Sequence, residues 1–301
     1  MRIKKLLYAP LLVLPLLFAA CGDDDDTTGE LQWSDNANAN PTAANAAYAR
    51  IEVPRLADGP QYRVLTYTVP TYGVNMIIEW DGAKRAQRWT AYQMHKDNSV
   101  VNWNRNNWKD TEWEGDPFQA DPNLPADIRT EQSDYSWTGY QRGHICPSAD
   151  RLCSKEANYQ TYFLSNIQPQ IGAFNTGVWL VMENQLRKWN QGTFRDTLYV
   201  CKGGTIADGQ TLPPNRLVGN STMKLPVPKY FFMAILCKKN GTYKALAFLA
   251  EHKADPSTNL APYVKSIDEL EELTGIDFFC NLPDNVENNV ESIVSPSAWG
   301  L

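Results

Sequence analysis

Apolar and polar residues alternate in several short runs along this chain of 301 residues, and each run is bounded by Gly, Pro, Asn or Asp. Alternation with a period of two is typical of strands that bury one face. The runs cover residues 62–69, 75–80, 89–94, 197–201, 230–237 and 243–249. They predict the strands of a mainly antiparallel sheet.

Helical patterns are fewer. Residues 177–189 carry large apolar side chains at three- and four-residue spacing. Near the C-terminus, Ser266 and Glu269 form a capping-box pattern before an apolar stretch that Gly275 ends. Residues 98–140 are polar, rich in Trp and without clear period, which indicates a long ordered loop. The predicted class is α+β, with a mainly antiparallel central sheet flanked by helices.

The first 20 residues have the composition of a secretion signal, in which positive charges precede an apolar run that ends on small residues directly before Cys21. The run is shorter than the roughly 20 residues that a membrane-spanning helix needs. Residues 17–21 resemble a bacterial lipobox, although Phe18 departs from the usual small aliphatic residue. We therefore expect cleavage before Cys21 and lipidation of its sulfur. An ordinary signal peptide with an incidental cysteine is the alternative.

Residues 21–47 combine four consecutive aspartates with Thr, Gly, Asn and Ala, and they offer little to bury. They predict a disordered acidic and polar tether. An acidic run after a lipidated cysteine resembles the export signals of surface lipoproteins, and a solubilising tail explains the same charges. We expect an exported protein of the cell envelope in either case. Residues 48–301 then form one large domain with a substantial core.

The formal net charge of the chain is −6. The predicted signal holds three positive charges and residues 21–35 hold six negative ones, so the remaining chain is close to −3. This balance argues against nucleic-acid binding through overall positive charge. A local basic cleft is compatible with it, although a solvated surface is the default interpretation of scattered charges.

The predicted domain contains five cysteines. In an oxidising compartment an odd number predicts one or two disulfides and at least one free thiol, with a pairing that the sequence does not define. The chain contains no Cys-x-x-Cys pair, which argues against a structural zinc site. The five are Cys146, Cys153, Cys201, Cys237 and Cys280.

Three histidines occur, His95, His144 and His252, so a metal site built from several imidazoles is nearly excluded and a catalytic histidine would act singly. His144 follows Arg142, which adds a fixed positive charge, and Gly143, which permits tight backbone geometry. Taken alone, a histidine after glycine is more often a structural or surface residue.

Asn175 and Glu183 lie eight residues apart. On one helix they would be on nearly the same side but about 12 Å apart along the axis, so both cannot be direct ligands of one ion. An arrangement that suits hydrated Mg²⁺ is direct coordination by the Asn175 oxygen, with Glu183 holding one of the metal's waters. The alternative is that Asn175 caps the helix and Glu183 faces solvent.

The residues around and after His144 form an extended motif: Arg142, Gly143, His144, Asn166, Pro169, Gln170, Asn175, Trp179 and Glu183. Their order and spacing resemble one family, the DNA/RNA non-specific endonucleases of the ββα-metal (His-Me finger) fold. Residues 227–232 and 273–279 also resemble the family's later strand and its closing helix-turn, so the similarity covers roughly residues 62–291.

The resemblance implies a Mg²⁺-dependent endonuclease, with Mn²⁺ as a substitute, that hydrolyses phosphodiester bonds of DNA and RNA and leaves 5′-phosphate and 3′-hydroxyl ends. His144 is then the general base, which suits a side chain whose unperturbed pKa is about 6.5. Asn166 helps to orient the attacking water or the imidazole, or is simply a turn residue. Arg105 clamps the scissile phosphate, with Arg88 as the fallback, because a guanidinium binds phosphate oxygens bidentately. Arg142 is a further catalytic candidate.

One position departs from the family pattern. Where most members have an aspartate before Arg-Gly-His, this chain has Gln141. The usual carboxylate helps to hold the metal's waters, and glutamine keeps an acceptor oxygen but loses the charge. We interpret Gln141 as a residue that still acts on the metal through water and tunes metal affinity or rate.

Two other functions are compatible with the same residues. A surface lipoprotein could bind nucleic acid or another polyanion with weak or no cleavage, which Gln141 and the acidic balance favour. A phosphodiesterase could apply the same chemistry to small substrates. A plasmid-nicking assay with Mg²⁺ and with chelator separates the first from a nuclease, and a substrate panel separates the second.

Overall fold

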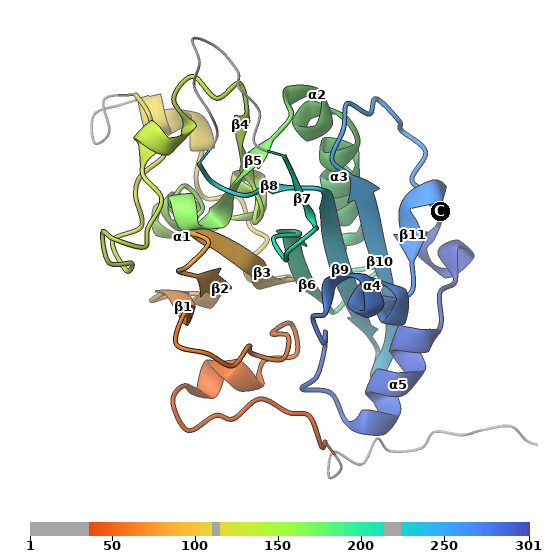
Figure 1. The fold of residues 1–301 in the computed structure, drawn as a ribbon. Helices are drawn as coiled ribbons and strands as arrows, with labels where there is room; N and C mark the ends of the chain where they lie inside the picture. The colour runs from red at the N-terminus through yellow and green to blue at the C-terminus, as the bar shows by residue number, and fades with distance from the viewer. Residues whose placement is uncertain (1–35, 110–114, 214–223) are drawn as a thin grey trace, which may run out of the picture. The chain divides into compact units, whose positions relative to one another are not determined.

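The computed structural model describes residues 36–109, 115–213 and 224–301. Its centre is a seven-stranded sheet in the order β1-β2-β3-β6-β9-β10-β11, in which all neighbours are antiparallel (Figure 1). All the predicted strands are confirmed, and each lies within one of the observed strands. The seven observed strands are β1 (Tyr62–Val69), β2 (Gly73–Asp81), β3 (Ala86–His95), β6 (Thr197–Gly204), β9 (Tyr230–Lys239), β10 (Thr242–Glu251) and the short edge strand β11 (Val264–Lys265), which was not predicted.

Different helices cover the two faces of the sheet. On β9, Phe231 and Met233 join the core cluster that includes the buried side of α3 (Leu180–Trp189). The next residue on the other face, Phe232, packs against Phe278, which follows α4 (Ile267–Thr274). Because both faces are covered, β9 is an almost continuous run of buried apolar residues.

The predicted helices are confirmed, with one shift. The capping box of α4 is formed, since Ser266 and Glu269 bond to each other's backbone, and the helix ends at Gly275 in the left-handed conformation. The predicted helix 177–189 is regular only from Leu180, because a kinked helical turn, Asn175–Trp179, precedes it. The sequence patterns did not indicate α1 (Lys155–Gln160) or α5 (Asp284–Ser292).

Two short strands outside the main sheet pair as a hairpin, β4 (Gln141–His144) with β5 (Ile167–Gln170). The short helix α2 (Gly172–Phe174), the kinked turn and α3 follow directly, which gives the expected order of two strands and a helix. A second small pair is β7 (Thr211–Leu212) with β8 (Val227–Pro228). The described part of residues 98–140 contains only short 3₁₀ turns and one isolated bridge, from Gln119 to Phe163, as expected of a long ordered loop.

Residues 36–47 differ from the prediction. They were expected to be part of the disordered tether, but they contact the C-terminal part of the domain. Asn38 donates to the carboxylates of Asp277 and Glu287, and Asn40, which is buried, donates to the Pro54 carbonyl. The ordered domain therefore begins before Tyr48, because the asparagines in this stretch find partners that composition alone does not reveal.

The prediction of disulfides is wrong for the described residues. All five domain cysteines are free thiols and all are buried, in separate parts of the structure such as β6 for Cys201 and β9 for Cys237. A buried cysteine packs as a small apolar side chain, so their odd number needs no pairing. Cys21 and the predicted signal lie outside the described residues.

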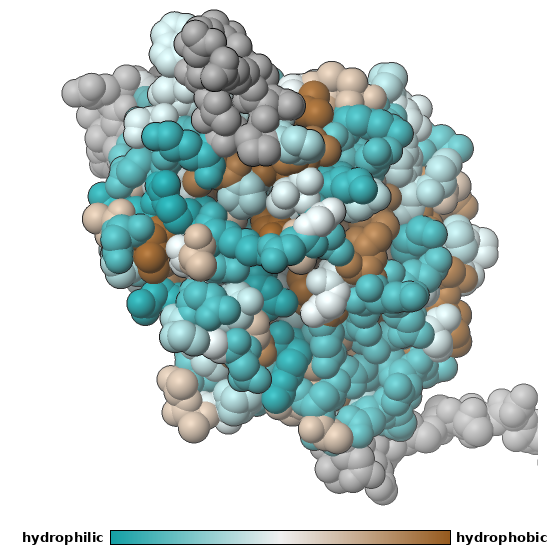
Figure 2. Space-filling view, in the orientation of Figure 1, coloured by the Kyte–Doolittle hydropathy of each residue, from teal (hydrophilic) through white to brown (hydrophobic). Residues whose placement is uncertain are grey.

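Within the described residues, no helix combines the length and apolar character that a bilayer crossing requires. Figure 2 shows one face of the molecule, which is mostly hydrophilic with small hydrophobic patches between polar side chains. This mixture is normal for a folded domain in contact with water.

Candidate active site

The β4–β5 hairpin positions His144 at its end, where His144 pairs with Ile167 and Gly143 pairs with Gln168. Glycine is needed at 143 because the side chain of Gln170 lies against it: a Cβ atom there would be 2.2 Å from Cδ of Gln170. Gln170 is fully buried and cannot move aside easily. The glycine of the motif is thus explained by close packing beside the histidine.

Asn166 fixes the chain that carries His144. Its Oδ1 accepts from the Cys146 backbone N–H at 2.9 Å, and its Nδ2 donates to the carbonyls of Cys146 and Thr161 at 2.9 and 2.8 Å. The side chain is fully buried. Because both ends of the amide bond to backbone groups, Asn166 fixes the backbone just after His144, and its role toward the water or the imidazole stays a prediction.

The His144 side chain is partly exposed and lies between aromatic rings. The ring centres of Phe118 and Tyr162 are 5.3 and 5.0 Å from that of the imidazole, and Nε2 is buried without a hydrogen-bond partner among the described residues. The pKa of His144 is lowered to about 3, mainly by burial and also by the positive charges of Arg105, Lys202 and Arg142. The imidazole is therefore held neutral, which is the form that accepts a proton.

Arg105 is brought close to His144, as the phosphate-clamp assignment requires. It is exposed, and its Nη1 donates to Ser148 Oγ at 3.2 Å, four residues after the histidine. The fallback Arg88 is excluded, since its guanidinium pairs with the fully buried carboxylate of Glu79 on the neighbouring strand β2. This ion pair joins two neighbouring strands of the sheet, so Arg105 remains the candidate for binding the scissile phosphate.

Arg142 lies over the ring of Phe118, with Cζ 4.0 Å from the ring centre, and its Nη1 is 2.8 Å from Oδ2 of Asp116. Arg142 and Phe118 line a pocket of about 570 Å³ together with Gln141 and Asn175. Sequence patterns did not indicate Asp116 or Phe118, because both belong to the irregular loop. The pocket brings three of the predicted residues to one open surface beside His144.

Asn175 and Gln141, the expected direct and water-mediated metal residues, are in contact. Asn175 Nδ2 donates to Gln141 Oε1 at 2.8 Å, which leaves Asn175 Oδ1 without a hydrogen bond among the described residues. The kink after Asn175 depends on Gly177, where a Cβ atom would be 2.2 Å from the Asp255 carbonyl oxygen. That carbonyl accepts from the Val178 N–H at 2.9 Å.

His252 anchors the segment that leads to Asn175. Its Nε2 accepts from the Ile171 N–H at 2.7 Å, which assigns the proton to Nδ1, and Nδ1 donates to the Pro228 carbonyl at 2.8 Å. The ring is buried, and burial lowers its pKa to about 4, although the bond to Pro228 opposes this shift. His252 is therefore held by backbone bonds inside the fold, whereas His144 lies against Phe118, which lines the pocket.

Glu183 does not face solvent, so that alternative is excluded. It is 8% exposed, and its carboxylate lies 3.4 Å from Nζ of Lys202 and 3.9 Å from Nη2 of Arg187. Burial raises the pKa of Glu183, and the charge of Lys202 opposes the rise. Arg187 also pairs with the buried Asp150 at 2.9 Å. Glu183 thus belongs to a buried network of alternating charges.

Sequence analysis did not single out Lys202, Arg187 or Asp150 of this network. Lys202 is the cation nearest to Glu183. Its side chain is fully buried, and Nζ lies 4.8 Å from the ring centre of Trp179. A signal was present, because Lys202 continues the alternate positions Leu198 and Val200, which form the apolar face of β6. A lysine on such a face requires a buried partner.

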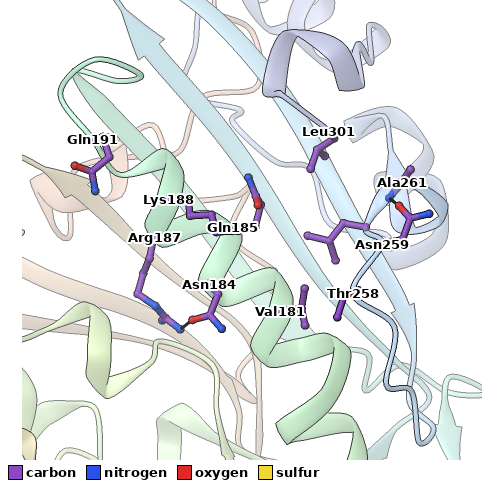
Figure 3. A pocket seen from close by; sticks show the side chains of 11 residues that line it. Val181, Asn184, Gln185, Arg187, Lys188, Gln191, Thr258, Asn259, Ala261 and Leu301 are labelled. Carbon is purple, nitrogen blue, oxygen red and sulfur yellow. Dashed lines mark hydrogen bonds between the residues drawn. The ribbon is translucent and has the colours of Figure 1, made fainter.

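A larger hollow of about 730 Å³ lies elsewhere, between α3 and residues 258–261 (Figure 3). Arg187 and Asn184 are joined there by a hydrogen bond of 2.8 Å. None of the residues proposed for catalysis or metal binding lines this hollow. Its volume alone does not indicate a catalytic function.

A family model described as DNA/RNA non-specific endonuclease matches residues 63–285. The chain belongs to this family. The matched region runs from β1 to the start of α5, so it contains the seven-stranded sheet, the His144 hairpin and the kinked turn. The chain is therefore an endonuclease, and its family is one of metal-dependent nucleases.

Relatives agree with this assignment. The chain is 30% identical to a nuclease of Nostoc sp. over 219 residues, 72% of this chain and 75% of that protein. A nuclease of Syncephalastrum racemosum is 34% identical over 177 residues, and the match covers 55% of each chain, about half of that relative. A chain in the crystal structure of the EndoG/EndoGI complex has the same fold, with a TM-score of 0.62, 16% identity, and coverage of 80% of this chain and 94% of that one.

The lowered pKa of His144 predicts the pH dependence of this endonuclease. A base acts when neutral, and a lowered pKa keeps the imidazole neutral as the pH falls below 6.5, so activity is lost only nearer the lowered value. We expect kcat/KM at pH 5.5 to stay within about twofold of its value at pH 7, whereas an unperturbed histidine would give about an eightfold loss. Initial rates on a DNA substrate at saturating metal give the profile. An acid limb centred at pH 6.5 or above would contradict the prediction.

Proposed function

We propose that this chain is a Mg²⁺-dependent, sugar-non-specific endonuclease that hydrolyses phosphodiester bonds of DNA and RNA to 5′-phosphate and 3′-hydroxyl ends. The observation that carries the proposal is the arrangement around His144: a neutral imidazole that feels the charges of Arg105 and Arg142, next to a pocket that Arg142 and Asn175 line. A base beside two positive charges suits attack by water on an anionic diester.

The residues present fit a hard cation. Asn175 offers a free amide oxygen at an accessible surface, and Gln141 fixes the orientation of that amide through its other atom. Oxygen donors, few in number, suit an ion that keeps most of its waters. When bound, Mg²⁺ supplies a positive charge that offsets the charge growing on the phosphate and leaving oxygens. Glu183, in its buried network, is proposed to act on the ion through water.

The side chains divide the remaining work. His144 takes the proton of the attacking water, and Arg105 binds the scissile phosphate through its exposed guanidinium. Arg142, held in place by Phe118 and Asp116, adds charge for the substrate strand. Asn166 keeps the imidazole in register through the Cys146 backbone.

We also propose that the protein is exported and lipidated at Cys21, so that it meets a membrane only through this anchor. The support is the apolar run before Cys21 and the acidic stretch after it. Labelling with a palmitate analogue in an expressing bacterium tests this, with Cys21→Ser as the control. Incorporation into the parent chain that persists in the variant would remove Cys21 as the anchor.

A nicking assay tests the activity. Purified chain is incubated with supercoiled plasmid and, separately, with structured RNA, in the presence of Mg²⁺ or of excess chelator. We expect cleavage of both substrates with Mg²⁺ and none with chelator. Binding without cleavage would instead identify a polyanion-binding lipoprotein, and hydrolysis restricted to small diesters would identify a phosphodiesterase.

The contact of Gln141 with Asn175 makes a prediction about metal affinity. Gln141→Asp restores a carboxylate next to the metal-binding amide, and groups that hold metal ligands are typically worth about 10- to 100-fold. We expect the added negative charge to lower the half-saturating Mg²⁺ concentration. The expected factor is about 10, the lower end of this range, because the aspartate side chain is one carbon shorter than glutamine and reaches less far. The measurement is the nicking rate against Mg²⁺ concentration at fixed ionic strength.

Gln141→Asn is the matched control, since it has the length of aspartate without its charge. Its half-saturating Mg²⁺ should be unchanged or higher than that of the parent. If Gln141→Asp gives the same value as Gln141→Asn, a charge at this position does not act on the metal.

A further inference from the structure

A group of carboxylates lies between the last two helices, away from His144. Asp268 and Glu271 come from α4 and Glu291 comes from α5, and one oxygen of each lies within 4.8 Å of the other two. Among the described residues this is the one place where three or more His, Cys, Asp or Glu side chains come this close. Figure 1 places α4 and α5 far from β4 and α2.

Glu291 is the unusual member. It is 6% exposed, and its Oε1 is buried without any hydrogen-bond partner among the described residues. A buried and unpaired carboxylate is costly, so it is normally protonated, paired or bound to a metal. Glu291 also lies in the last turn of α5, where the helix dipole disfavours negative charge.

The surrounding charges make the position worse for an anion. Among the described residues, no ion pair joins Asp268, Glu271 or Glu291 to a Lys or Arg side chain. The pKa of Glu271 is raised to about 8 and that of Glu291 to about 10, mainly by burial and also by neighbouring carboxylates, including Glu287 and Asp277. A cation at this place would relieve burial and repulsion together.

We propose that Asp268, Glu271 and Glu291 bind a Ca²⁺ ion that is distinct from the catalytic metal and stabilises the domain. Two oxygens on opposite sides of Ca²⁺ are about 4.8 Å apart, at roughly 2.4 Å each, so three oxygens within this span fit one coordination shell. Ca²⁺ takes six to eight oxygen ligands in flexible geometry, with carboxylates and waters, whereas Mg²⁺ rarely gives up enough water for three carboxylates. The exposed Asp268 leaves a path for the ion and its waters.

The ion would tie α4 to α5 at the place where the N-terminal stretch docks. Asn38 donates there to Asp277 and to Glu287, both of which raise the pKa of Glu291. Its effect is on stability and not on the chemistry at His144. The inference therefore does not depend on the proposed nuclease activity.

The test is thermal unfolding of the full chain in chelator and in millimolar Ca²⁺. Ca²⁺ at about 100 times its Kd should raise the Tm of the parent by on the order of 5 °C. Asp268→Asn and Glu291→Gln should lose most of this rise, and Glu291→Gln should have a higher Tm than the parent in chelator. Glu272→Gln, an exposed neighbour on α4, is the matched control and should keep the full rise.

The number of bound Ca²⁺ ions distinguishes the proposed site from binding of Ca²⁺ at the catalytic site. Equilibrium dialysis with Ca²⁺ should show one bound ion fewer for Glu291→Gln and Asp268→Asn than for Glu272→Gln, while Mg²⁺-dependent nicking by all three stays as in the parent. Equal Tm rises or equal stoichiometry in Asp268→Asn and Glu272→Gln would overturn the proposal, even if Glu291→Gln fails to fold. Loss of nicking in parent and variants alike would count against the proposed function only.

Discussion

Replacing His144 with alanine is expected to lower the rate of DNA cleavage at least about 100-fold, the usual effect of removing a general base. Burial and the positive charges of Arg105, Lys202 and Arg142 favour the neutral imidazole in the parent, and both arginines remain in the variant. The measurement is the initial rate of plasmid nicking at saturating Mg²⁺. Because the two arginines remain, binding of DNA should change little.

His95→Ala is the control, since it removes a histidine at the end of β3, outside the pocket that Arg142 and Asn175 line. It should cleave as fast as the parent. His144→Ala should keep the Tm and the circular-dichroism spectrum of the parent, because the Cys146 backbone remains fixed by Asn166. Cleavage by His144→Ala within threefold of the parent would remove His144 from the mechanism.

Replacing Lys202 with methionine is expected to lower the free energy of unfolding by about 3 kcal/mol. Lys202 is fully buried, and it is the nearest positive charge to the buried carboxylate of Glu183, at 3.4 Å. Methionine fills the space but leaves Glu183 with only the distant guanidinium of Arg187 at 3.9 Å. Urea unfolding at pH 8 gives the value, and Lys253→Met, an exposed change, should leave it unaltered.

The loss should depend on pH in a defined direction. Burial already raises the pKa of Glu183, and Lys202 opposes that rise, so the variant has a still higher folded-state pKa. An acid whose folded pKa exceeds its unfolded pKa loses relative stability as the pH rises through the folded value. The defect should therefore be smaller at pH 5 than at pH 8. In the double variant Glu183→Gln/Lys202→Met, most of this stability loss should disappear. A double variant as unstable as Lys202→Met would show that the unpaired Glu183 carboxylate does not cause the loss.

The sequence by itself determined the six long strands of the central sheet and two of the helices, α3 and α4. Each predicted strand was found, because alternation reflects burial of one or both faces of the sheet, and the Ser266–Glu269 capping box was formed as the local pattern required. The motif around His144 was sufficient to indicate the family, because its residues resemble those of the family in order and spacing.

Only the tertiary structure decided which side chains meet. Asn166 bonds to the Cys146 backbone, and Gln141 accepts a hydrogen bond from Asn175. Glu183 pairs with Lys202. The two members of each of these pairs are at least 19 residues apart in sequence. Local patterns record whether a residue is buried or exposed, but they contain no distance between distant segments. The docking of residues 36–47 was missed because it depends on partners that folding brings together. The cysteines were expected to pair, but folding buries each of the five as a free thiol.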